Sequence, residues 1–431
     1  MKATIDITPH CNLRCKHCYN SEKYFKKSIQ EMSQEQVMEL FYRLAEQGCD
    51  EINFLGGEPL VRSEILNFLR LTHALKMRNS LTTNGTLLGE NRFETIFREG
   101  LVDNLIISLD GQTAEEDDRI RGKGVFQKVM HSLERVREWR KKHHPQMTVS
   151  ISFCLFENML DKSGYEIVDI CRDKCVDSIS FFPLLDAGAA ANNHLIREHN
   201  PEIVHCFLDK IIAYASDVYP QLIISIEERP VIADYFNIKY TNMSICPESQ
   251  TSCGVVKKYI YIKADGTVLP CGFVEFSDGY KEQELGSFSE EDAPSVQNNV
   301  RILDVYQSRL YVDFLTAFAK YRKQQPNLIC RGCRYEPVCL PCPYQNKNGE
   351  ILLDCVSIMP QYQQIIETSK NWLLKQVFHN EMLDRLFSVE KTPTLLDSFH
   401  TVTGFSNYTD FLYYVISFEK KGLLKIERIK S

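Results

Sequence analysis

The stretch KATIDITPHCNLRCKHC, residues 2–18, decides the fold of this chain. Its first seven residues alternate apolar and polar side chains, which is the pattern of a β-strand. Cys11, Cys15 and Cys18 follow directly, with the spacing C-x3-C-x2-C. Three thiolates on one short loop can ligate three irons of a four-iron cluster, whereas a structural cluster takes four protein ligands. The motif therefore predicts an iron–sulfur site with one open position, as catalytic metal sites require.

Two histidines beside these cysteines leave an alternative open. His10 and His17 could each supply a fourth ligand, and three cysteines with one histidine would then form a closed zinc site. A disulfide is the weaker alternative, because the chain opens without the apolar segment of a secretory signal and is expected in the reducing cytoplasm.

Outward from this stretch, short apolar strands alternate with helix-length segments as far as about residue 235. Ser33 and Gln36 form a capping box before a helical run that Gly48 closes. The further strands are EINFLGG (51–57), SLTTNG (80–85), NLIISLD (104–110), TVSISFCLF (148–156) and SISFFPLL (178–185). About six β/α units predict an α/β fold, a partial (β/α)6 TIM-like barrel, with a doubly wound sheet as the alternative. In either fold the site lies at the carboxyl ends of the strands.

Polar motifs stand at these strand ends. They are Gly56-Gly57-Glu58-Pro59 after the second strand, Thr83-Asn84-Gly85 after the third, Ser108-Leu109-Asp110-Gly111 after the fourth, and Asp118 with Arg121-Gly122 on the next connection. Each motif alone is compatible with an ordinary turn or a surface residue. Their order, together with the cysteine motif, resembles the radical S-adenosylmethionine (SAM) superfamily.

The resemblance implies one [4Fe-4S] cluster on Cys11, Cys15 and Cys18, and SAM as a second cofactor. It places Gly56, Gly57, Glu58 and Pro59 at the SAM amino group, and Ser108 and Arg121 at the SAM carboxylate. His17 would lie near the adenine, with Asp110 and Asn158 as further candidates around the ribose. The reduced cluster would cleave SAM to a 5′-deoxyadenosyl radical, which abstracts a hydrogen atom from the substrate. An electron donor such as flavodoxin or ferredoxin is implied.

A second group of eight cysteines follows residue 240, in a stretch rich in Gly and Pro that also contains the Asp265-Gly266 turn signal. Part of it could form a zinc ribbon, but a ribbon uses only four cysteines. The group resembles the SPASM domain, which implies two auxiliary [4Fe-4S] clusters with interleaved ligands. One would take Cys246, Cys253, Cys271 and Cys342, and the other Cys330, Cys333, Cys339 and Cys355. The spacing from Cys339 to Cys342 is one residue shorter than the usual form.

The predicted domains are therefore a radical SAM partial barrel over 1–235, a SPASM domain over 236–360, and a helical, winged-helix-like extension over 361–431. Cys49, Cys154, Cys171, Cys175 and Cys206 lie outside the two groups and are interpreted as core residues. The net charge of -7 does not favour nucleic-acid binding. No apolar run is long enough for a membrane span.

Barrel plus SPASM domain is typical of enzymes that modify peptides or proteins by crosslinking, thioether formation, epimerisation or oxidation. A ribosomally made peptide is the expected substrate, and its leader would be bound by residues 361–431 or by a separate protein, because only ten residues precede Cys11. A dehydrogenase of a small molecule is an alternative. Sulfatase maturation is disfavoured by two departures from the pattern of the enzymes in that branch. They have a carboxylate residue directly after the cysteine that corresponds to Cys271, where this chain has Gly272. They also have Cys-Tyr-Tyr at the third cysteine of the loop, where this chain has Cys18-Tyr19-Asn20. A zinc-binding scaffold is the non-enzymatic alternative.

Overall fold

The structure is a computed structural model that describes residues 1–21, 30–185, 187–195, 201–226, 230–247, 259–269 and 271–272. It also describes a two-stranded antiparallel sheet of β11 (Gln376–Phe378) and β12 (Ile426–Arg428). The predictions for Cys253, Cys330, Cys333, Cys339, Cys342 and Cys355, and those for the extension from 361 apart from these two strands, lie outside the described residues.

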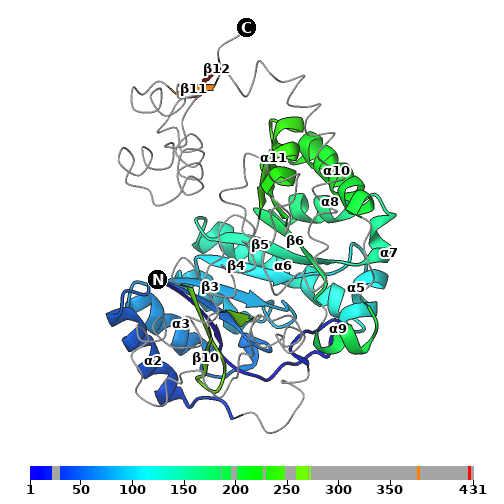
Figure 1. Cartoon of the computed structure of the whole chain (residues 1–431). Helices are drawn as coiled ribbons and strands as arrows, with labels where there is room; N and C mark the ends of the chain where they lie inside the picture. The colour runs from blue at the N-terminus through cyan, green and yellow to red at the C-terminus, as the bar shows by residue number, and fades with distance from the viewer. Residues whose placement is uncertain are drawn as a thin grey trace, which may run out of the picture.

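One ten-stranded sheet organises the fold (Figure 1). Eight strands run parallel in chain order: β1 (Lys2–Asp6), β2 (Glu51–Leu55), β3 (Arg78–Thr83), β4 (Asn104–Ser108), β5 (Thr148–Leu155), β6 (Ser178–Pro183), β7 (Ile223–Ile226) and β8 (Ser244–Pro247). The six strands expected from the sequence are all present. The structure adds β7 and β8 in the same direction.

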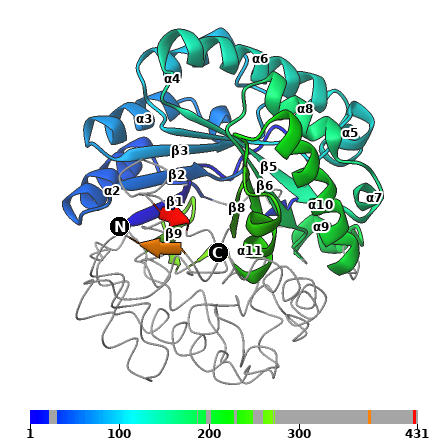
Figure 2. The same cartoon turned by 90° about the horizontal axis from the view of Figure 1, so that it is seen from above.

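The helices lie along the outer side of the curved sheet (Figure 2). They are α2 (Gln34–Glu46), α3 (Ile65–Ala74), α4 (Glu94–Arg98), α5 (Ala114–Arg121), α6 (Val125–His143), α7 (Glu157–Leu160), α8 (Tyr165–Asp173), α9 (Gly188–Asn192), α10 (Pro201–Val218) and α11 (Pro230–Lys239), with 3-10 turns η1 (Pro59–Val61) and η2 (Asn91–Phe93). Within the described residues the end strands β8 and β10 do not pair with each other. An open, curved sheet with helices outside agrees with the predicted partial barrel and not with a doubly wound sheet.

The helix α2 shows how local sequence determines an element. The Ser33 hydroxyl accepts a hydrogen bond from the Gln36 amide, and the Gln36 side chain accepts one from the Ser33 amide, so the predicted capping box is formed. Four apolar residues at helical spacing are buried against the sheet: Val37, Leu40, Phe41 and Leu44. Burying each such side chain contributes roughly 1.5–3 kcal/mol.

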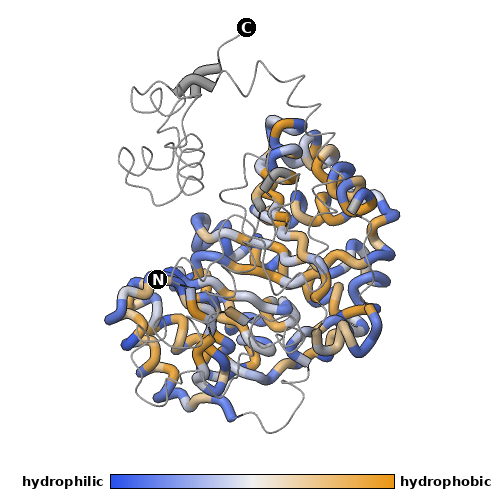
Figure 3. Tube along the Cα trace, viewed as in Figure 1, coloured by the Kyte–Doolittle hydropathy of each residue, from blue (hydrophilic) through white to orange (hydrophobic). Residues whose placement is uncertain are grey.

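The two faces of the sheet differ. Residues such as Phe54, Ile107 and Phe153 are buried in one core with the helices, and Figure 3 shows apolar and polar stretches alternating along the chain. The other face carries the intervening residues, which from β4 to β8 are mostly half-buried. Since side chains alternate along a strand, the helices cover one face and leave the other for the site.

The chain returns to its first strand late in the sequence. Strand β9 (Tyr259–Ile262) pairs in parallel with β1, and β10 (Val268–Leu269) pairs antiparallel with β9. The predicted turn joins them, with Gly266 at a φ of 88° that favours glycine. The Tyr261 hydroxyl donates a hydrogen bond of 2.6 Å to Asp6. The strands β8, β9 and β10 follow residue 235, where the first domain was predicted to end, and they extend its sheet.

Candidate active site

The loop that carries Cys11, Cys15 and Cys18 begins where β1 ends, and its backbone is held by the 56–58 segment. The Gly57 amide donates to the Thr8 carbonyl and the Glu58 amide to the His10 carbonyl, each at 2.8 Å. A Cβ atom on Gly56 would lie 2.4 Å from the Thr8 oxygen, and one on Gly57 would lie 2.2 Å from the His10 oxygen. Both glycines are therefore required for contact between two backbone segments, a reason that the sequence analysis did not foresee.

Arg62 holds the same loop and was missed by the sequence analysis. Its guanidinium is buried and donates to the carbonyl of Ile7, the residue that precedes the loop, and to the Met32 carbonyl at 2.7 Å. Its position four residues after Glu58 was the available signal. An isolated arginine beside a motif, however, is more often a surface residue.

Two further segments contact the loop from the other side of the site. The Lys16 amide donates to the Ile120 carbonyl in α5, and the Ala189 amide donates to the Cys18 carbonyl, both at 2.9 Å. A Cβ atom on Gly188 would lie 2.3 Å from the Tyr19 oxygen. The cysteine loop is thus bounded by β2, α5 and α9, which leaves its backbone little freedom.

The three thiols of this loop are half-buried and near one another. Burial raises the pKa of Cys15 to about 12 and that of Cys18 to about 11, and it also raises the pKa of Cys11. Buried thiolates are stable only beside a compensating positive charge, which iron ions supply. Three such thiols on one fixed loop fit the implied cluster. His10 is exposed, whereas His17 contacts Asp110.

Glu58 is fully buried and its carboxylate has three hydrogen-bond donors. They are the amides of Leu60 at 3.0 Å and Asn84 at 2.7 Å, and the Thr83 hydroxyl at 2.7 Å. Burial raises the pKa of Glu58 despite these donors. A carboxylate accepts about four hydrogen bonds, so Glu58 can accept one more, for example from an ammonium group. Its three present hydrogen bonds join the ends of β2 and β3.

Asn84 extends this connection to the cluster loop. Its side-chain amide lies 3.9 Å from the Cys11 sulfur and donates to the Asn12 side chain at 2.8 Å. The sequence had placed Thr83-Asn84-Gly85 at a strand end without assigning these side chains a role.

A buried charge network lies at the ends of β4 and β5. The Arg121 guanidinium lies 2.5 Å from Asp110 and 3.7 Å from Asp117, and His17 Nε2 lies 3.2 Å from Asp110. Burial alone would raise the pKa of Asp110, but Arg121 and His17 hold it below the usual value. Burial lowers the pKa of His17 to about 4. Asp110 is therefore an anion and His17 is neutral at pH 7.

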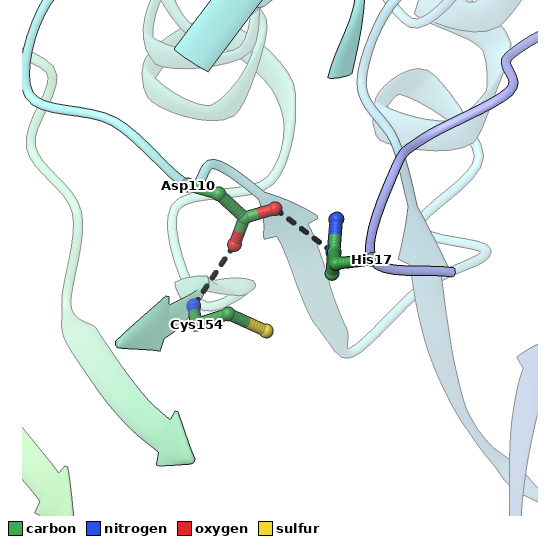
Figure 4. A group of neighbouring side chains, drawn as sticks. All are labelled: His17, Asp110 and Cys154. Atoms are coloured by element: carbon green, nitrogen blue, oxygen red, sulfur yellow. Dashed lines mark hydrogen bonds and ion pairs between the residues drawn. The ribbon is translucent and has the colours of Figure 1, made fainter. Parts of the chain in front are cut away.

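Cys154 completes a group with His17 and Asp110, drawn in Figure 4. The candidate ligand atoms of the three residues lie within 4.8 Å of one another, and the Cys154 amide donates to Asp110 at 2.9 Å. Cys154 was interpreted from the sequence as a core residue, and its half-buried side chain does pack against the core. It also lies beside the charge network, which the sequence did not indicate.

The remaining predicted residues have separate positions. Ser108 is half-buried as the last residue of β4, Pro59 is buried at the start of η1, and Asn158 is exposed in α7. Cys246 lies in β8 and Cys271 follows β10, so these two predicted ligands come from the two opposite end strands of the sheet.

Several buried polar atoms of the site have no hydrogen-bond partner: Arg121 Nε, His17 Nδ1 and Asp117 Oδ2. Buried polar groups in native proteins are usually paired, so these atoms suit a polar ligand next to the cysteine loop. The donors and acceptors fit the ammonium, carboxylate and adenine groups of SAM.

Residues 5–158 match the model of the radical SAM superfamily. The AdoMet-dependent heme synthase of Oleidesulfovibrio alaskensis is 24% identical over 346 residues, which cover 76% of this chain and 81% of that protein. A GTP 3′,8-cyclase of Marinobacter nauticus is 25% identical over 274 residues, covering 62% and 77%.

Two solved structures have the same fold. The structure of Streptococcus suis SuiB bound to S-adenosylmethionine covers 80% of this chain and 73% of its own, with a TM-score of 0.59 and 15% identity. The structure of anSMEcpe with bound AdoMet covers 86% and 99%, with a TM-score of 0.60 and 18% identity. Among the described residues, no helix combines the length and apolarity needed to cross a bilayer.

Proposed function

We propose that this chain, an enzyme whose residues 5–158 form a radical SAM domain, modifies a peptide or protein after cleaving SAM. The observation that carries the proposal is the cysteine loop, which is clamped by backbone contacts on both sides next to a buried network with unpaired polar atoms. Rigid support of this kind fits a site that must position two cofactors.

The radical SAM domain implies SAM and one [4Fe-4S] cluster. When bound, they supply an electron and a 5′-deoxyadenosyl radical that takes a hydrogen atom from the substrate. Cys11, Cys15 and Cys18 hold the cluster. Arg121 and Ser108 would bind the SAM carboxylate, for which Arg121 offers an Nε that has no hydrogen-bond partner.

The neighbouring residues orient SAM. The segment Gly56–Pro59 approaches its amino group, and neutral His17 lies beside the adenine. Asp110 and Asn158 are assigned to the ribose and nearby groups, although the exposure of Asn158 supports it less.

The proposal includes a SPASM domain over 236–360 with two auxiliary clusters, followed by the extension 361–431. Cys246 lies on one end strand and Cys271 just after the other, so a cluster that they share would join the two sides of the open sheet. An electron donor such as flavodoxin or ferredoxin and a leader-binding region or protein belong to the same proposal.

A peptide is preferred as substrate because structures of similar fold were solved with peptides, including SuiB bound to precursor peptide SuiA. A tetrapyrrole is the second candidate. It is favoured by the match to the heme synthase over most of both chains.

The test is SAM cleavage by the anaerobically reconstituted full chain with dithionite. We expect 5′-deoxyadenosine to form without any substrate, and Arg121→Gln to weaken SAM binding at least about tenfold, because a charged hydrogen bond contributes about 1.5–3 kcal/mol. The control is Arg92→Gln, which removes an exposed arginine. Bound zinc with no 5′-deoxyadenosine would instead identify a scaffold protein.

A further inference from the structure

Exposed cations lie over the cysteine loop. From Cys11 to Lys16, exposed side chains alternate with half-buried ones, so that exposed Arg14 and Lys16 flank the half-buried Cys15. The thiols of the loop are therefore only one residue away from side chains that another molecule can reach. A partner that docks on this surface comes close to the cluster that the thiols are proposed to hold.

Helix α5 adds two further cations to this surface. The Lys16 amide donates to the Ile120 carbonyl at 2.9 Å, so the loop runs along the end of α5. Figure 1 shows the loop, in dark blue, beside α5 and α9. Arg119 precedes this contact in the chain and Lys123 follows it, and both side chains are exposed. We call Lys16, Arg119 and Lys123 the basic patch.

The side chains of the basic patch have no ion pair or hydrogen bond with any residue that the structure describes. Other exposed cations of the fold have such partners: Arg70 is paired with Glu99, and Arg92 with Glu90. Neighbouring cations without a counter-charge repel one another, which is a cost to the folded chain. The basic patch therefore favours an anionic partner, because binding removes this repulsion.

The acidic residues of α5 do not neutralise the basic patch. Glu116 and Asp117 are buried, and Asp118 is half-buried and accepts hydrogen bonds of 2.6 and 2.9 Å from two backbone amides. Glu115 is the exposed carboxylate of this helix and has no ion pair with a described residue. The exposed charge here is mainly positive, in a chain whose net charge is -7. An anionic partner is therefore repelled by the chain as a whole and attracted at the basic patch, which directs it to this surface.

The position of the basic patch selects the kind of anionic partner. The proposed cluster needs one electron for each SAM that it cleaves, and electron transfer slows steeply with the distance between donor and acceptor. A carrier must therefore dock where the cysteines lie close to the surface. Redox encounters bury small interfaces, and electrostatic attraction raises their association rate, so a few cations suffice for such a partner. A nucleic acid instead takes an extended basic surface.

We propose that an acidic electron-carrier protein docks on the basic patch, over Lys16, Arg119 and Lys123, and reduces the cluster through the cysteine loop. This rests on the proposed function, and it defines the docking surface of the electron donor and the charge that the donor presents. One electron leaves the carrier and enters the [4Fe-4S] cluster. The carrier is oxidised and the cluster is reduced, and no bond is formed or broken.

The test uses the anaerobically reconstituted full chain and a fluorescently labelled flavodoxin, an acidic protein with a flavin cofactor. Its Kd for the chain is measured at low salt, together with the rate at which the reduced flavodoxin is oxidised. We expect Lys16→Glu, Arg119→Glu and Lys123→Glu each to raise Kd about 2- to 10-fold, because each turns an attraction between exposed charges into a repulsion. Raising the salt from about 0.05 to 0.5 M should also raise Kd. Arg119→Lys keeps the charge and should retain the affinity.

Lys141→Glu is the matched control. Lys141 is also exposed and without a partner among the described residues, but it lies in the last turn of α6, just before β5 and so at the opposite end of the strands. This variant changes the net charge by the same amount and should bind flavodoxin as the wild type does. Reduction of Arg119→Glu and Lys123→Glu by reduced methyl viologen, a small cation, should match the wild type. Iron content and circular dichroism identify any variant that fails to fold.

The proposal is overturned if Lys141→Glu weakens flavodoxin binding as much as the patch variants do, or if Kd does not depend on salt. It is also overturned if the patch variants keep flavodoxin binding and lose binding of a hexaglutamate peptide, because the patch would then receive an acidic substrate segment. Equal slowing with methyl viologen would show that the variants alter the cluster and not the docking. Failure of the wild type to form 5′-deoxyadenosine with dithionite contradicts the proposed function instead, since the Kd values do not depend on SAM cleavage.

Discussion

The two halves of the sheet carry different polar groups on their strands. Around β1 to β3 they are buried and paired: Glu58 accepts three hydrogen bonds, Arg62 donates to two carbonyls, and Asp6 accepts from Tyr261. From β4 to β8 the inner face carries half-buried, uncharged hydroxyls.

The difference concerns how firmly each half of the sheet fixes its backbone. Paired buried polar groups fix a backbone in one geometry, because breaking any pair leaves an unsatisfied group. Partly exposed, uncharged hydroxyls such as the bonded pair Ser150 and Ser178 lose less when one contact is broken. The first half therefore fits the support of a metal-binding loop, and the second half constrains its backbone less strongly.

The largest expected effect is loss of the metal site in the first half. Cys15→Ser should lower the iron content by about four atoms per chain, since a cluster without one thiolate is not held, and should abolish 5′-deoxyadenosine formation. Cys206→Ser, at an exposed position on α10, should change neither. Equal iron in the two variants would place the cluster elsewhere.

The next effect comes from adding a methyl group where Gly57 contacts the backbone of the cysteine loop. Gly57→Ala would put a methyl group 2.2 Å from the His10 oxygen, so we expect a loss of about 3 kcal/mol in unfolding free energy, together with poor cluster incorporation. Gly48→Ala is the comparison, because Gly48 has open space but a φ of 78°; it should cost about 1 kcal/mol. Denaturant unfolding measures the free energy of unfolding of both variants. Equal losses would show that the close contact between Gly57 and the cysteine loop is not needed for stability.

Removing the buried guanidinium should have a somewhat smaller effect. Arg62→Gln leaves a carbonyl of Ile7 or Met32 without its donor, which costs about 1–3 kcal/mol. Arg70→Gln removes an exposed arginine that contacts Glu99, and should cost no more than about 1 kcal/mol. If the two variants unfold at the same denaturant concentration, Arg62 does not support the loop.

The smallest effect is on the pH dependence of stability, through the buried carboxyl group of Asp117. Burial raises the pKa of Asp117 from 3.8 to about 6. The folded chain therefore binds more protons than the unfolded chain between these values, and its stability falls as pH rises through them. Asp117→Asn removes this contribution, so its unfolding temperature should fall less steeply from pH 4 to 6.

Exposed Glu115 on the same helix supplies the control. Glu115→Gln should follow the wild-type profile, and an Asp117→Asn profile parallel to the wild type would show that Asp117 does not titrate in this range.

The strands and the motifs at their ends were predictable because their signals are local. The alternation in residues 148–155 and the capping box at Ser33 each lie within a few residues, and the structure has both. The alternation also puts Cys154 on the face of Ser152, next to the charge network, in addition to its contact with the core.

Other features depend on contacts between distant segments. The residues near Arg62 do not indicate that it will donate a hydrogen bond to the Ile7 carbonyl. The sequence of residues 259–262 likewise does not indicate that this strand will pair with residues 2–5. Glu58 suggests a ligand for an ammonium group, yet its three donors come from its own segment and the end of β3. Such pairings follow from packing of the whole sheet, which sequence spacing does not encode.

The parallel pairing of β9 with β1 has a consequence for biosynthesis. The frame of the cysteine loop includes Ala264, which accepts from the Met32 amide at 2.8 Å, and it is incomplete until the ribosome has released about 270 residues. Until then β1 has an unpaired edge, the kind of strand that attracts wrong partners. Before β9 is translated, the cysteine loop lacks these contacts, so cluster insertion should follow translation of β9. Protease digestion of stalled chains would test this order, because the loop should become protected only in chains that include β9.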